Sequence, residues 1–225
     1  METHLEAGVE RGRNIRTWLF NPFHYVAGGK ALAVGVVLVL GSSFVGSLSN
    51  SHFDGVLDYH TGLRAPWWVF LSEGLIAWLV MGVLLLFGGK VISASRVRVV
   101  DVFGTQALAR APMFVVALLS LLPGVGRFVD ELMKIALDPG ADPLVVAQQF
   151  RMLLTANMAD TVVFGLHTTV GLVMLVWMIA LMYRAYSVSC NITGKKAVLV
   201  FIPLLILGEV ISKIVLFQVF RVAGL

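Results

Sequence analysis

Long apolar runs alternate with short polar stretches along this chain. A helix that crosses a bilayer needs about 20 apolar residues, and four runs approach or reach that length. They cover residues 31–48, 65–88, 160–183 and 197–220. A fifth apolar run, 111–125, is shorter, so we expect its helix to begin near Val99 and to be kinked or ended by Pro112 and Pro123. The pattern predicts an all-α bundle of five transmembrane spans, with the third over residues 99–125.

Aromatic and polar residues between the runs predict the remaining elements. Ile15–Tyr25 combines aromatic and basic residues, which is typical of a segment lying in the headgroup plane, and residues 1–14 form a polar N-terminus. Residues 126–160 contain a turn at 138–143 between two stretches of helical period, which we expect to extend the third and fourth spans beyond the membrane. Tyr183, Arg184 and Tyr186 are expected to anchor the end of the fourth span at the interface.

The composition is typical of a membrane protein, and the sequence lacks several motifs of catalytic sites. Hydrophobic residues make up 58% of the chain and charged residues 13%, against about 25% charged residues in a typical soluble domain. The net charge of +4 fits the basic loops of a membrane protein and does not indicate nucleic-acid binding. One cysteine excludes an intramolecular disulfide, and no nucleotide, hydrolase or metalloprotease motif is present. We therefore expect no catalytic residue, no cofactor and no metal site.

The distribution of lysine and arginine predicts an orientation. If the loops alternate between the two sides, eleven of these residues fall on the side of the N-terminus and five on the other. The richer side is expected to be cytoplasmic. The polar N-terminus lacks the pattern of a cleavable signal peptide. We expect a multi-pass protein of a bacterial cytoplasmic membrane, with its N-terminus inside and its C-terminus outside.

A few polar residues interrupt the spans and are the candidate functional residues. They are Glu73, His167, Glu209, Ser212 and Lys213. A charge at the bilayer centre costs about 2.5–3.5 kcal/mol on insertion scales, so such residues mark either a functional site or a polar contact between helices. Glu209 and Lys213 are one helical turn apart and can neutralise each other, which favours a structural lock.

The other two titratable candidates have no such local partner. Glu73 lies in the second span with no basic residue one turn away, so an ion pathway and a helix contact stay equally open for it. His167 in the fourth span fits a hydrogen-bonded packing residue better than a proton relay.

Small residues recur on one face of the first span. They are Ala31, Gly35, Ser42, Gly46 and Ser49. Such a stripe lets two helices approach closely. It fits packing within one chain or self-association through the Gly35, Ser42 and Gly46 face, and the sequence does not separate the two.

Two stretches resemble the Yip1 domain in its bacterial form. The first is residues 101–123, with Asp101, Thr105, Arg110 and Pro112 at positions similar to the third span of that family. The second is residues 174–207, which resembles the fourth span with Trp177, a loop after Tyr183, and the fifth span. The resemblance implies five spans, a cytoplasmic N-terminus and no catalytic activity.

The resemblance also frames the function hypotheses. Eukaryotic relatives bind Rab-type GTPases, but this chain lacks their long N-terminal cytosolic region and a clear DLYGP stretch, so Rab binding is not expected. The first hypothesis is a non-enzymatic protein that acts in membrane organisation through contacts with lipid and other membrane proteins. The alternative is a small ion- or proton-coupled transporter or channel that uses Glu73, His167, Glu209 and Lys213.

Overall fold

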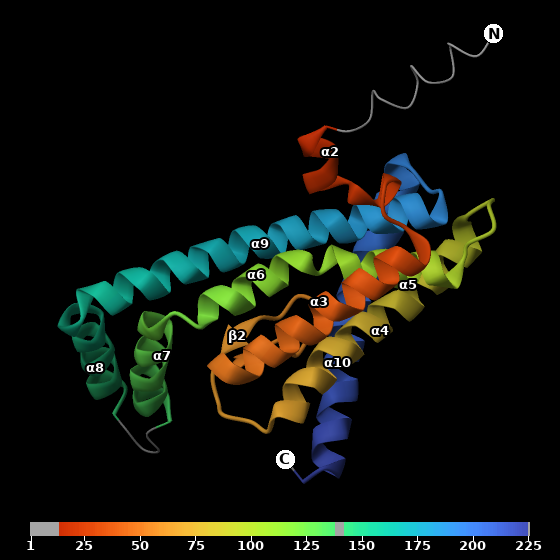
Figure 1. The fold of residues 1–225 in the computed structure, drawn as a ribbon. Coiled ribbons are helices and arrows are strands. Elements are labelled where there is room, and N and C mark those ends of the chain that lie inside the picture. The colour runs from red at the N-terminus through yellow and green to blue at the C-terminus, as the bar shows by residue number, and fades with distance from the viewer. Residues whose placement is uncertain (1–13, 138–141, 225) are drawn as a thin grey trace.

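Long apolar helices dominate the computed structural model, which describes residues 14–137 and 142–224 (Figure 1). Among these residues, five helical stretches are long and apolar enough to cross a membrane. They are α3 (Gly28–Ser49), α4 (Trp67–Ile92), α5 (Val99–Ala109) together with α6 (Ala111–Ser120), α9 (Met158–Cys190) and α10 (Gly194–Val222). The prediction of an all-α bundle of five spans is confirmed.

The third span is broken in the middle. Pro112 lacks an N–H group and leaves the carbonyl of Leu108 without its helical partner. The chain turns at Arg110, whose N–H bonds to the carbonyl of Ala107 at 3.2 Å, so α5 ends and α6 begins there. The span also ends at Ser120 and not at 125 as predicted, because Pro123 begins a new helix.

The segment after the third span forms two separate helices, α7 (Pro123–Ala136) and α8 (Pro143–Ala156). They turn sharply away from α6 and α9 and lie side by side (Figure 1), so the prediction that they extend the spans is wrong. The physical cause is extended backbone at Leu122, before Pro123, and a non-helical conformation at Asn157 between α8 and α9. Most of the predicted turn at 138–143 lies outside the described residues.

The fourth span continues well past its predicted end at 183. Tyr186 is fully buried and its ring lies 6.2 Å from that of Phe201 in α10, so it packs inside the bundle and is not an interfacial anchor. The ring of Tyr183 also packs edge-on against Phe201. Helix α9 ends only at Cys190, where Asn191 adopts the left-handed conformation that commonly terminates helices.

The N-terminal segment forms the short helix α2 (Ile15–Phe20) and the 3-10 turn η2 (Pro22–His24). The indole of Trp177 in α9 donates a hydrogen bond to the carbonyl of Leu19 at 2.9 Å and fastens α2 to the bundle. The side chains of Trp18 and Phe20 remain exposed. Residues 1–13 of the predicted polar N-terminus lie outside the described residues.

The small-residue face of α3 packs inside the bundle. Ala31, Gly35, Ser42 and Gly46 are buried, and α3 contacts α5, α6 and α4. A Cβ atom on Gly35 would lie 2.5 Å from the backbone nitrogen of Leu108. The stripe therefore serves close approach of helices within one chain.

The loop between α3 and α4, residues 50–66, folds back onto the bundle, and we call it the first loop. Its strands β1 (Ser51–His52) and β2 (His60–Thr61) pair antiparallel. Phe53 and Val56, between the strands, are buried in the same apolar core as residues of α4, α6, α9 and α10. This insertion places loop atoms beside polar residues of the spans.

Candidate functional site

The first loop contacts four of the five polar candidates in the spans. Glu73, His167, Glu209 and Lys213 each bind an atom of this loop. The partners come from residues 52–59, which follow α3 directly. The candidate site is therefore a set of contacts between one loop and three different spans.

Glu73 in α4 is 2% exposed and binds two loop groups. Its Oε1 lies 2.8 Å from Nδ1 of His52, and its Oε2 accepts the backbone N–H of Phe53 at 3.0 Å. Both carboxylate oxygens are therefore paired inside the protein. Helix α4 supplies no partner for Glu73, and the first loop supplies two.

A proton must lie between the imidazole of His52 and the carboxylate of Glu73. Its Nε2 lies 2.8 Å from the carbonyl of Leu63, which can only accept, so Nε2 carries a hydrogen. Its Nδ1 faces a carboxylate oxygen, and two lone pairs would repel at 2.8 Å without a proton between them. Burial alone would lower the pKa of His52, but the hydrogen bonds to Glu73 and Leu63 outweigh it and raise the pKa.

Glu209 in α10 also binds the backbone of the loop. Its Oε2 accepts the N–H of Leu57 at 2.7 Å. A Cβ atom on Gly55 would lie 2.5 Å and 2.6 Å from the two carboxylate oxygens, so a larger residue would force the carboxylate to shift. Ser212 on the same helix is fully buried, and its hydroxyl donates to the carbonyl of Glu209 at 3.0 Å.

Lys213 binds Asp58 of the loop, and its Nζ also lies 3.5 Å from Oε1 of Glu209. The one-turn pairing expected from the sequence is present. Each charge also has a second partner in the first loop, which is the N–H of Leu57 for Glu209 and the carboxylate of Asp58 for Lys213.

His167 in α9 lies in a small hydroxyl cluster. Its Nε2 is 3.0 Å from the hydroxyl of Tyr59 and 3.1 Å from that of Ser120, which are 2.6 Å apart. Burial raises the pKa of the Tyr59 phenol. Because Ser120 gives its proton to the carbonyl of Val116, it is not set up as a nucleophile.

Arg110, at the break in the third span, is 7% exposed, and its Nη2 has no hydrogen-bond partner among the described residues. It lines a cavity of about 20 Å³ together with Ser43 and Phe53. Such a volume has room for about one water molecule. The carboxylate of Glu209 only partly compensates the cost of burying this charge.

The remaining residues at Yip1-like positions join helices to one another. The hydroxyl of Thr105 donates to the carbonyl of Asp101 at 2.7 Å and lies 2.8 Å from the hydroxyl of Ser189 in α9. Pro112 breaks the third span. Trp177 bonds to α2, and the ring of Tyr183 packs against Phe201 in α10. These positions define the packing of the third, fourth and fifth spans.

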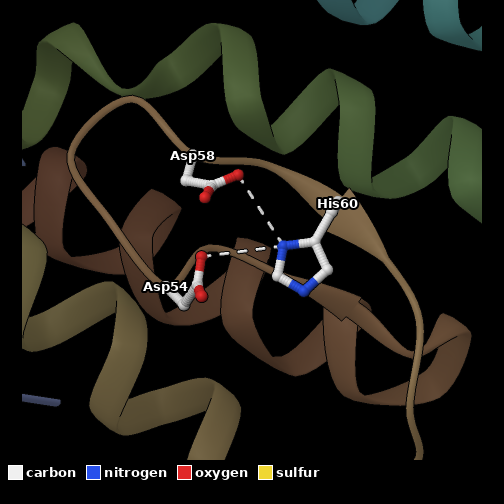
Figure 2. A group of neighbouring side chains, drawn as sticks. All are labelled: Asp54, Asp58 and His60. Atoms are coloured by element: carbon white, nitrogen blue, oxygen red, sulfur yellow. Dashed lines mark ion pairs between the residues drawn. The ribbon is translucent and has the colours of Figure 1, made fainter. Parts of the chain in front are cut away.

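Three side chains of the first loop form a cluster that the sequence analysis did not anticipate (Figure 2). Asp54, Asp58 and His60 each offer one potential metal-ligand atom, and these atoms lie within 4.8 Å of one another. One usable signal is present in the sequence, because residues 52–60 contain two histidines, two aspartates and a tyrosine between two apolar spans. That density was missed because none of these residues falls within a span.

Comparison with known proteins places this fold in a family. The model of the Yip1 domain matches residues 8–212, which is most of the chain. No curated protein and no solved structure matches the chain. The family match and the five apolar helices agree with a multi-pass membrane protein. The chain therefore belongs to the Yip1 domain family.

Proposed function

We propose that this protein is a non-enzymatic member of the Yip1 family that acts in membrane organisation through contacts with lipid and with other membrane proteins. The observation that carries the proposal is the placement of polar groups. Glu73, Glu209 and Lys213 are bound by the first loop, and the cavity beside Arg110 has a volume of about 20 Å³. Groups bound in this way stabilise a fold and are not free to carry a solute.

The outer surface of the spans supports the same proposal. Large apolar side chains are exposed along it, among them Val37, Phe87, Val176 and Phe217, each with about two thirds of its area exposed. In a bilayer such side chains contact lipid tails or the spans of another protein. The surface is thus suited to contacts within the membrane plane.

The N-terminal segment adds a contact with the membrane surface. In α2 the side chains of Ile15, Trp18 and Phe20 are exposed, while Trp177 ties the helix to α9. Aromatic residues of this kind settle at the headgroup level. We propose that α2 lies on the cytoplasmic face of a bacterial inner membrane, with the C-terminus outside, since the basic loops occur on the N-terminal side.

Reconstitution of the full chain into liposomes tests the proposal. We expect the protein to change the distribution of vesicle diameters in cryo-electron micrographs and to give no ion or proton flux above that of empty vesicles. Trp18→Ser with Phe20→Ser should weaken the effect on diameter. Trp67→Ser, which removes an exposed tryptophan from the first turn of α4, is the matched control and should retain it.

Measurements of ion and proton flux distinguish the proposed function from the transporter hypothesis. Wild-type flux above empty vesicles that is lost in Glu73→Gln and Glu209→Gln would contradict the proposal. An unchanged distribution of vesicle diameters would contradict it as well.

A further inference from the structure

Asp54 and His60 have no part in the proposed function, whereas Asp58 also binds Lys213. Nδ1 of His60 lies 3.6 Å from Oδ1 of Asp54 and 3.7 Å from Oδ1 of Asp58. Figure 2 shows the two carboxylates pointing toward the same ring nitrogen. Hydrogen bonds between nitrogen and oxygen are about 2.7–3.2 Å long. The two contacts are therefore ion pairs that are too long for direct hydrogen bonds, and the three atoms lie within 4.8 Å of one another.

The two separations from His60 match those of ligands around one metal ion. Zn²⁺ bonds to imidazole nitrogen and carboxylate oxygen at about 2.0–2.2 Å. Two ligands at tetrahedral or trigonal angles are then about 3.3–3.8 Å apart. The distances from His60 to both carboxylates fall within this range.

A second observation points to a ligand at the same place. Oδ1 of Asp54 is buried from solvent and accepts no hydrogen bond from any described residue. A buried polar atom without a partner needs an explanation, such as a bound ion or water. This oxygen is the one that faces His60.

Charge and access also favour a cation. Three carboxylates, those of Asp54, Asp58 and Glu209, act on the ammonium of Lys213, so negative charge exceeds positive charge around this lysine. The side chains of Asp54, Asp58 and His60 are between a third and a half exposed. An ion could enter from solvent and keep water molecules in its open positions.

We propose that Asp54, Asp58 and His60 bind one divalent transition-metal ion of the Zn²⁺ class. An imidazole nitrogen with two carboxylate oxygens suits such ions. The ion joins β2 to the two aspartates between the strands and so fixes the first loop, which binds α4, α9 and α10. This site is additional to the proposed function and shares only Asp58 with it.

Titration of Zn²⁺ into the full-length chain tests the proposal. The protein is purified in detergent, freed of its affinity tag and treated with chelator, and binding is followed by calorimetry. We expect one ion per chain and a higher midpoint of thermal unfolding in its presence. Asp54→Asn and His60→Ala should each weaken binding at least tenfold. Asp130→Asn and His24→Ala, which change an exposed aspartate and an exposed histidine elsewhere, should not.

Co²⁺ provides a second measurement that needs no variant. The wild-type protein should give the visible absorption of an ion with protein ligands, and Zn²⁺ should displace it. The proposal is overturned if wild type binds no Zn²⁺ and leaves the spectrum of aqueous Co²⁺ unchanged. Wild-type affinity for Zn²⁺ in folded Asp54→Asn and His60→Ala would overturn it too.

Discussion

Single residues show how charges are accommodated inside this membrane protein. The one-turn pairing of Glu209 with Lys213 has a separation of 3.5 Å, whereas the bond from the Leu57 N–H to Glu209 measures 2.7 Å. Glu73, which has no partner on its own helix, is bound at 2.8 Å and 3.0 Å by loop groups. The loop therefore supplies the shorter contacts to both carboxylates and satisfies their lone pairs.

Gly55 gives a prediction at this scale. Gly55→Ala places a methyl group 2.5 Å from Oε1 of Glu209 and must push the carboxylate off the N–H of Leu57. We expect a loss of about 1–3 kcal/mol in the free energy of unfolding in detergent. Gly62→Ala is the matched control, since its nearest neighbour would be a His60 ring carbon at 3.5 Å.

A double-mutant cycle isolates the cause. In a Glu209→Ala background the added methyl group meets no carboxylate, and Gly55→Ala should cost little further stability. Equal costs of Gly55→Ala with and without Glu209 would show that the clash is not the reason.

Among the helices, α3 is held by close backbone contact with α5. The methyl-sized space at Gly35 is already filled by Ala107 and the backbone of Leu108. Dispersion between closely packed backbones drives helix association in lipid, where no hydrophobic effect separates one apolar surface from another. Gly104 of α5 makes a second close approach, because a Cβ atom there would lie 2.8 Å from the backbone nitrogen of Leu32 in α3.

Gly35→Ala is expected to destabilise the protein by about 1–3 kcal/mol, because α3 must move away from α5. Gly29→Ala on the same helix has nothing within 4 Å of the new Cβ atom and should change stability by less than about 1 kcal/mol. Thermal unfolding of both variants in detergent checks this. Similar midpoints for the two would refute the close-contact argument.

The sequence predicted the spans far better than the site. Apolar runs long enough to cross a bilayer are local signals, and Pro112 marked the break in the third span by its missing N–H. The partners of Glu73 and Glu209 could not be predicted, because they are backbone and side-chain groups of a loop that are brought near by folding. The angles of α7 and α8 were also missed, because Pro123 disfavours helical backbone at Leu122 but does not determine the direction in which α7 leaves.

The whole molecule has a predicted orientation that labelling can test. Cys190 is the only cysteine of the chain, so a Cys190→Ala background allows single-cysteine variants. An impermeant maleimide added to intact cells should label Asp142→Cys, at the start of α8, and should reach Ser95→Cys, between α4 and α5, only after permeabilisation. Labelling in the reverse pattern would contradict the orientation.

The bond between Leu57 and Glu209 joins residues 152 positions apart, and this separation has a consequence for biogenesis. The first loop emerges early in synthesis, while α10 is the last helix of the described chain. Until α10 inserts, the N–H of Leu57 and the carboxylate of Asp58 lack their native partners. Non-local contacts form slowly, and exposed incomplete intermediates are prone to misassembly. Insertion of the final helix is thus the step that completes the fold of a loop made far earlier.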